Sequence, residues 1–316
     1  MDCPVDRGIG WFIEGIIPLL LFCKNQIVLK FIGITNGGGD LSVDMIKNVT
    51  LPLLAHFGVN AEVDIQSRGF PPLGGGEVLL KVDPISSGVL NNVSMGNEYK
   101  VTKIAGLAVC SLLSPQLNNR VISSCKPLLR PLCRDVHIFS DVDKRGRGGG
   151  VGVKRKSPGY SLLLVALSSP SSKFRSQEEQ DEEKEEDKEE ERRSGGLEGN
   201  DHMRVAVEIT SNPSSSSSLS LPEEVGLACG GSLLEEIMKG GAVDSHHQPL
   251  ALLLMALSKD KVSTINVGER LCGGGVEVLR LVKKVFGVQF QIKKTDQGIK
   301  LSCLGANIVS RSRAVS

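Results

Sequence analysis

The sequence predicts an α/β (α+β) fold assembled from repeated α/β units. The order helix, strand, helix, strand, strand occurs in residues 8–83. The same order recurs in residues 222–308, where one additional helix precedes it. In both copies the second of these helices closes with Phe-Gly-Val, at Phe57 and again at Phe286, and a strand opens directly after it. We therefore expect an internal repeat, with a glycine ending that helix in each copy.

Each element of the first copy follows from its local pattern. The pattern predicts helix, strand, helix, strand and strand over residues 9–23, 26–35, 42–58, 61–67 and 77–83. Asp40 or Ser42 can cap the second helix, because both side chains accept hydrogen bonds from free backbone N–H groups. The apolar run 16–22 is too short to span a bilayer, and Pro18 interrupts it.

The final copy and the region between the copies are assigned in the same way. The final copy should contain helix, helix, strand, helix, strand and strand over residues 223–241, 247–258, 262–268, 275–287, 288–294 and 298–305. The middle region should contain strand, helix, strand and strand over residues 100–113, 114–132, 135–142 and 160–168. Ser114 is expected to cap the middle helix, with Pro115 in its first turn.

Two tracts in the middle region are too polar to bury a core. Residues 178–191 hold eleven acidic residues in fourteen, and a serine-rich run follows one short apolar stretch, residues 204–210. We predict disordered loops over residues 169–203 and 211–221, because such tracts cannot offset the loss of chain entropy. The expected domains are residues 1–97, 98–221 and 222–316.

Composition excludes several classes of function. Eight cysteines, none closer together than Cys125 and Cys133, argue against a zinc knuckle and a C-x-x-C redox pair. Of the five histidines only His246 and His247 are adjacent, and neighbours point in different directions, so we expect a surface feature and no metal site. No cofactor motif is present, and reduced thiols fit the cytosol or nucleus.

The stretch RGFPPLGGGEV, residues 68–78, combines a stiff and an unrestricted segment. Pro71 and Pro72 fix φ, whereas Gly74, Gly75 and Gly76 permit positive φ and close approach of another backbone. One interpretation is a hairpin with a wide loop between two strands. The other is a glycine cradle for phosphate with Arg68 beside it, although the spacing matches no known nucleotide loop.

A basic cluster occupies residues 144–156. Its cations are Lys144, Arg145, Arg147, Lys154, Arg155 and Lys156. Two basic groups with a neutral spacer fit a nuclear-import signal or a loop that binds a phosphate backbone, and a plain solvated loop stays open as the alternative.

Taken together, six stretches resemble the RNA 3′-terminal phosphate cyclase family, and its cyclase-like branch in eukaryotic ribosome biogenesis above all. They are GITN, DLSVDMIKNVTLPLLAHFGV, RGFPPLGGGEVLLKV, LSPQLNNRVI, KSPGYSLLLVA and LLEEIMKGGAVDSHHQPLALLLMAL. The resemblance implies a large domain of repeated α/β units, with a smaller α/β domain inserted before the last repeat. It makes residues 71–76 a signature turn, and it implies a further repeat before Asp2.

The resemblance also bears on activity. True cyclases form a nucleotidyl-histidine, and the matching segment here places Cys272 near the position of that histidine, so cyclase activity is not expected. The cyclase-like branch tends to carry Arg-Asp-x-Lys in its last helix, where this chain has Arg280, Leu281 and Lys283. Arg280 and Lys283 lie three apart on one helical face, where they could contact phosphate or could simply be solvated.

The resemblance therefore implies a non-enzymatic factor for early pre-rRNA processing. It would act in the nucleus and nucleolus with pre-rRNA, a ribosome-biogenesis GTPase and the small-subunit processome, without a membrane. A pre-rRNA endonuclease is the alternative, and an ATP-dependent RNA 3′-phosphate cyclase is a third.

Overall fold

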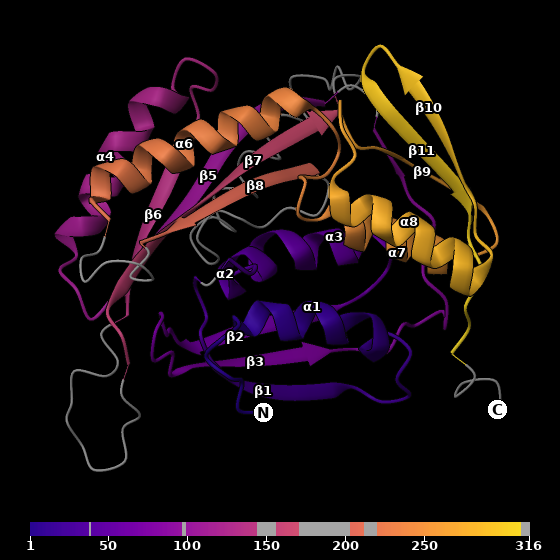
Figure 1. Cartoon of the computed structure of the whole chain (residues 1–316), viewed down its shortest axis with the longest axis horizontal. Helices are drawn as coiled ribbons and strands as arrows, with labels where there is room; N and C mark the ends of the chain where they lie inside the picture. The colour runs from indigo at the N-terminus through magenta and orange to yellow at the C-terminus, as the bar shows by residue number, and fades with distance from the viewer. Residues whose placement is uncertain (38, 97–98, 144–155, 171–202, 212–219, 311–316) are drawn as a thin grey trace, which may run out of the picture.

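The computed structural model describes residues 1–37, 39–96, 99–143, 156–170, 203–211 and 220–310. Three sheets and the helices packed on them make up this part of the chain (Figure 1). The sheets are antiparallel or mixed, which confirms the predicted α/β class. No helix among these residues has both the length and the apolar character that a membrane span requires.

The first copy forms a three-stranded antiparallel sheet of order β1-β3-β2 with helices on one face. Its elements are α1 (Ile9–Leu20), β1 (Ile27–Gly33), α2 (Val43–Met45), a π-helical turn (Ile46–Thr50), α3 (Leu51–His56), β2 (Ala61–Ser67) and β3 (Gly76–Val82). The Ser42 side chain accepts from the Met45 N–H at 3.0 Å, so Ser42 is the cap of the second helix. Gly58, at φ 81°, follows the helix end at Phe57, as predicted.

The final copy repeats this arrangement. Its elements are α7 (Gln248–Leu257), β9 (Val262–Asn266), α8 (Gly273–Phe286), β10 (Phe290–Thr295) and β11 (Gly298–Leu304). The order β9-β11-β10 is the same as β1-β3-β2, and Gly287, at φ 71°, ends α8 as Gly58 ends α3. A short strand from the first region, β4 (Ser94–Met95), adds to this sheet parallel to β9.

The middle sheet has the order β6-β5-β7-β8, with β5 and β6 parallel and the other pairs antiparallel. Its elements are β5 (Tyr99–Ser111), α4 (Gln116–Leu129), β6 (Val136–Asp143), β7 (Gly159–Pro170) and β8 (Met203–Thr210). Alternate residues of β7 face two cores: Leu162 and Leu164 lie in the one under α4, and Leu163 and Val165 in the larger one shared with the first copy.

Helix α6 (Pro222–Lys239) also covers the middle sheet, beside α4 (Figure 1). Val225, Cys229 and Leu233 lie in the same core as α4, although the expected boundary at residue 222 assigns this helix to the final copy. The sequence pattern predicted no strand over residues 203–210, which form β8. The other expected domain limits stay predictions, and most of the two predicted loops lies outside the described residues.

Helix α1 is largely covered by its own neighbours. Ile9, Ile13 and Ile17 are buried in the larger core, so the inward face of this helix is packed against described residues of the chain. Its outer face keeps Trp11 and Leu19 exposed, at 47% and 71%.

The close contact between α4 and α6 depends on one glycine. A Cβ at Gly226 would lie 2.0 Å from Ser124 Oγ and 2.4 Å from the Val121 carbonyl oxygen, whereas one at Gly231 on the same helix meets nothing within 4 Å. Gly226→Ala should therefore lower the free energy of unfolding by about 1–3 kcal/mol, because the helices must move apart.

Gly231→Ala is the matched control. It should raise the stability by about 0.5–1 kcal/mol, since alanine costs less backbone entropy in a helix. Urea denaturation measures both variants, and equal effects would contradict the packing described here.

Candidate functional site

The turn between β2 and β3 is a hairpin turn packed against the end of β1. β2 and β3 are antiparallel, which confirms the hairpin interpretation. The Thr35 N–H donates to the Gly69 carbonyl at 2.8 Å, and the Gly69 N–H donates to Thr35 Oγ1 at 3.0 Å. The Leu73 N–H donates to Ser157 Oγ at 3.0 Å, so the turn also contacts the segment that precedes β7.

The glycines of this turn allow one backbone to lie directly on another. A Cβ at Gly76 would lie 2.4 Å from Thr35 Cγ2, and one at Gly74, at φ 65°, would lie 2.9 Å from the Gly33 carbonyl carbon. Since the chain itself fills these spaces, Gly74 and Gly76 are required for packing and do not form an open phosphate cradle.

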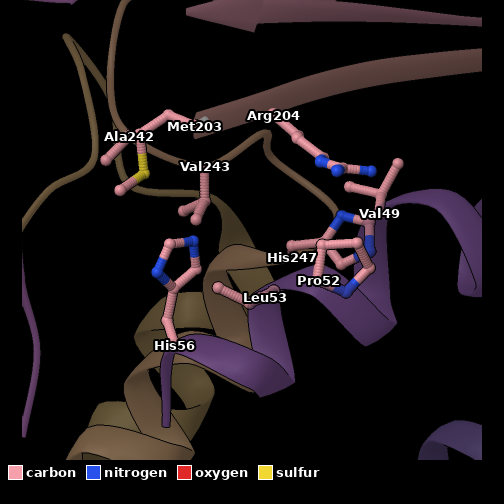
Figure 2. Close-up of a pocket in the computed structure, with 9 residues that line it drawn as sticks. All are labelled: Val49, Pro52, Leu53, His56, Met203, Arg204, Ala242, Val243 and His247. Atoms are coloured by element: carbon pink, nitrogen blue, oxygen red, sulfur yellow. The ribbon is translucent and has the colours of Figure 1, made fainter. Parts of the chain in front are cut away.

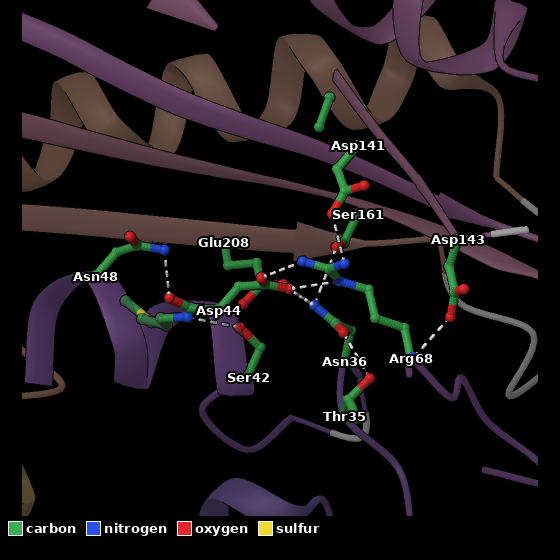
Figure 3. A network of polar contacts seen from close by, with 12 residues as sticks. Thr35, Asn36, Ser42, Asp44, Asn48, Arg68, Asp141, Asp143, Ser161 and Glu208 are labelled. Carbon is green, nitrogen blue, oxygen red and sulfur yellow. Dashed lines mark hydrogen bonds and ion pairs between the residues drawn. The ribbon is translucent and has the colours of Figure 1, made fainter. Parts of the chain in front are cut away.

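Arg68 lies beneath the turn in a buried ion pair (Figure 3). Its Nη2 donates to Asp44 Oδ1 at 2.6 Å and its Nε to Asp44 Oδ2 at 3.2 Å, while Nη1 donates to Asp141 Oδ2 at 2.6 Å. The Arg68 N–H donates to Asp143 Oδ2 at 2.8 Å. One arginine thus joins α2, the hairpin and β6.

Asn36 extends this network to the middle sheet. Its Nδ2 lies 2.8 Å from Asp44 Oδ2, 3.1 Å from Glu208 Oε1 and 3.3 Å from Ser161 Oγ, and Thr35 Oγ1 donates to Asn36 Oδ1 at 2.7 Å (Figure 3). The side chain is fully buried, so these bonds replace the water that it would otherwise bind.

The pKa values of the two neighbouring carboxyl groups, Asp44 and Glu208, are shifted in opposite directions. Burial alone would raise the pKa of Asp44, but the Arg68 guanidinium outweighs it and the pKa is lowered. Burial, and then the Asp44 carboxylate, raise the pKa of Glu208 to about 7. The site therefore holds an ionised Asp44 beside Glu208, whose pKa lies far above that of an ordinary glutamate.

Glu208 also lines a cavity of about 300 Å³, large enough for a small ligand or part of a nucleotide. The other walls come from the loop after β1, the turn, the end of β8 and the segment before α7. They include Gly37, Asp40, Pro71, Thr210 and His246. We call this space the Glu208 cavity.

His247 does not form the surface feature that the sequence suggests. The ring is 1% exposed; Nδ1 lies 2.8 Å from Asp244 Oδ1, and Nε2 lies 2.8 Å from Thr50 Oγ1. Desolvation would lower the pKa of His247, but Asp244 outweighs it and the pKa is raised. The prediction was wrong for His247, because the sequence does not show that the π-helical turn covers this residue, whereas His246 is exposed.

A small pocket beside His247 contains His56 and Arg204 (Figure 2). Its volume of about 20 Å³ is close to that of one water position, so it is too small for a substrate. Within the described residues, no group of three His, Cys, Asp or Glu side chains is placed to hold a metal ion.

Comparisons with known proteins agree on one family. The model of the family "RNA 3'-terminal phosphate cyclase" matches residues 1–292. The Homo sapiens RNA 3'-terminal phosphate cyclase-like protein is 33% identical over 325 aligned positions, covering 99% of this chain and 76% of the relative.

The chain belongs to the RNA 3′-terminal phosphate cyclase family. Two more relatives have similar coverage. The rRNA processing protein rcl1 of Schizosaccharomyces pombe is 33% identical over 99% of this chain and 76% of its own length. A probable RNA 3'-terminal phosphate cyclase-like protein of Arabidopsis thaliana is 33% identical over 100% of this chain and 77% of its own length. These relatives confirm the resemblance to the cyclase-like proteins of the family.

Cys272, which the resemblance places near the position of the cyclase histidine, precedes α8; this correspondence stays a prediction. Cys272 is the N-cap there: its Sγ accepts from the Gly275 N–H at 3.2 Å, and its own N–H donates to Gln248 Oε1 at 2.8 Å. Arg280 and Lys283 lie further along α8, and both are exposed. Their role as RNA contacts stays a prediction.

The structure separates the remaining candidate RNA contacts. Arg68 is 5% exposed, so its guanidinium is committed to the two aspartates. The Lys156 side chain is 9% exposed, with Nζ 4.0 Å from Asp143 Oδ2, which leaves little of it for a phosphate backbone. The five other cations of the basic cluster, residues 144–155, lie outside the described residues.

Sequence reasoning missed the acidic half of this site. Asp44 interrupts an otherwise apolar helical face, and a buried carboxylate of that kind calls for a cationic partner. The position of Asp44 in the sequence could therefore have predicted a buried ion pair. Glu208 was missed because residues 204–210 were not predicted as a strand, so no face could be assigned to it.

The protonation of Glu208 should appear in the pH dependence of stability. Its folded pKa, about 7, lies above the ordinary 4.5, so its contribution to stability is complete below pH 4.5 and is lost as the pH rises through 7. A shift of this size corresponds to about 3 kcal/mol. Glu208→Gln cannot ionise, and it should remove most of this decline.

Urea denaturation at pH values from 4.5 to 8 measures the effect. Glu235→Gln, on the exposed side of α6, is the control and should keep the wild-type profile. A Glu208→Gln profile parallel to that of the wild type would contradict the assignment.

Proposed function

We propose that this chain is a non-cyclising factor for early pre-rRNA processing and small (40S) ribosomal subunit biogenesis. The observation that carries the proposal is the 33% identity, along 99% of this chain, to the rRNA processing protein rcl1 of Schizosaccharomyces pombe. In this proposal the chain binds pre-rRNA and a ribosome-biogenesis GTPase within the small-subunit processome.

The absence of cyclisation chemistry rests on Cys272. A nucleotidyl-histidine requires an imidazole nucleophile, and the resemblance places a thiol, that of Cys272, near the position of that histidine. We propose that the chain forms no covalent nucleotide intermediate. A labelled adduct from ATP that survives denaturation and maps to Cys272 would contradict this part of the proposal.

A pre-rRNA endonuclease is the less favoured alternative. The carboxylate that the cyclase-like branch tends to carry between its arginine and lysine is replaced by Leu281, which is 53% exposed and offers no acid, base or metal ligand. Binding without cleavage therefore fits this helix better.

The proposed RNA-binding surface is the outer side of α8. Arg280, Lys283 and Lys284 are exposed and spaced three and four apart, so they share one face of the helix. From α8 to β11, residues 273–304, six cations and two carboxylates give a net charge of +4, compared with +1 for the whole chain. This concentration of positive charge suits a phosphate backbone.

Nuclear and nucleolar localisation is part of the same proposal. It is supported by the basic groups at Lys144–Arg145 and Lys154–Lys156, whose spacing fits a bipartite import signal, although Lys156 itself is largely buried. A tagged full-length chain that stays outside the nucleus would contradict it.

The RNA contact is tested by removing two charges from α8. The double substitution Arg280→Gln and Lys283→Gln should weaken binding to single-stranded RNA at low salt. It should also reduce the slope of log K against log salt concentration by about 1–2, because binding releases fewer counterions when fewer phosphates are contacted. Fluorescence anisotropy with an end-labelled oligonucleotide measures both quantities.

The matched control removes two exposed arginines from another surface, by Arg130→Gln and Arg134→Gln at the end of α4. Equal losses of slope in the two double variants would show that only net charge matters. An unchanged slope in the α8 variant would exclude this helix as the phosphate contact.

A further inference from the structure

The only tryptophan of the chain lies exposed at the start of α1. Its side chain is 47% exposed, although tryptophan buries more apolar surface than any other side chain when a core is available. The Phe12 ring packs against it edge-on, with the ring centroids 5.0 Å apart and an angle of 88° between the planes. The indole is therefore held in place and still open to solvent.

Arg7 lies over the indole ring. Its guanidinium carbon is 4.9 Å from the ring centroid, within the range of a cation–π contact. Two hydrogen bonds to the Asp40 carboxylate hold the guanidinium: Nε donates to Oδ2 at 3.1 Å, and Nη2 donates to Oδ1. Arg7 itself is half-exposed, so a planar cation and an aromatic ring are fixed in contact at the surface.

Asp40 determines what this pair can attract. Its carboxylate is buried and also accepts from the Gly8 N–H at 2.7 Å, so it stays in place and offsets the charge of Arg7. A phosphate gains little from a cation that is already paired. A flat, uncharged group gains more, because it can stack on the ring or on the guanidinium plane.

Asp40 is also one of the residues that line the Glu208 cavity. The residue that holds the Arg7 guanidinium in place is therefore also a wall residue of that cavity.

The geometry points to Trp11 and Arg7 as a stacking platform for a nucleobase of single-stranded RNA. This inference rests on the proposed RNA-binding function and identifies a group that contacts the bases, whereas α8 contacts the phosphates. The platform holds a base by stacking, so it adds affinity without adding to the salt dependence.

The intrinsic fluorescence of the full-length chain tests this directly, because the single tryptophan reports on the platform alone. A ten-residue oligouridylate should quench the emission, and inorganic polyphosphate of equal charge should not. Trp11→Leu should weaken oligouridylate binding at least about fivefold, with the salt slope unchanged. Arg7→Lys, which keeps the charge but loses the plane, should weaken it in the same way.

Leu19→Gln is the matched control, since Leu19 is the other large exposed residue on α1. Its affinity should stay within twofold of the wild type, and thermal melts of all variants should coincide. Equal losses for Leu19→Gln and Trp11→Leu would overturn the inference and indicate an apolar protein-docking surface.

Oligouridylate binding without quenching, together with unchanged affinity in Trp11→Leu, would also overturn the platform while the proposed RNA-binding function stands. Failure of the wild-type chain to bind any RNA at low salt would overturn both.

Discussion

The buried ion pair between Asp44 and Arg68 is the constraint on which the arrangement of this site depends. Two ions of this kind lose their hydration, and only close geometry with further hydrogen bonds offsets that loss. Both side chains are almost fully buried and joined at 2.6 Å, and Asn36 and Asp141 supply the additional contacts. The turn, the second helix and β6 therefore have to lie in one particular arrangement.

A second buried polar cluster joins the middle of β8 to the first copy. Asp244 accepts from the backbone N–H groups of Ala206 and His247, and His247 reaches Thr50 of the first copy. The middle sheet is thus attached to the helices of the first copy by two polar clusters, one around Asp44 and one around Asp244. Apolar packing between these layers supplies stability, while the polar clusters determine register, because unpaired buried groups are costly.

These two polar clusters bear on where the proposed base contacts and phosphate contacts lie. The Glu208 cavity lies between layers that the ion pair holds together, and the stacking pair at Trp11 shares Asp40 with its wall. The basic face of α8 belongs to the final copy, whose α7 begins directly after Asp244 and His247. In this proposal the base contacts and the phosphate contacts belong to different copies of one repeat.

Much of the fold could be predicted because its signals are local. Helical and strand periodicities located nearly every element, and the two Phe-Gly-Val segments revealed a repeat that the matching strand orders confirm. The packing of α6 on α4 depends on Gly226 meeting Val121 across helices far apart in sequence. The burial of Arg68 and His247 depends in the same way on tertiary contacts, which no local pattern reports.

A double-mutant cycle on Asp44 and Arg68 tests the central claim most directly. Arg68→Met alone should lower the free energy of unfolding by about 3–5 kcal/mol, since it leaves a buried carboxylate unpaired, and adding Asp44→Leu should recover much of that loss. The same cycle on the exposed pair Arg120 and Glu223 should show a far smaller coupling. Equal coupling in the two cycles, or a negligible loss in Arg68→Met, would contradict the account.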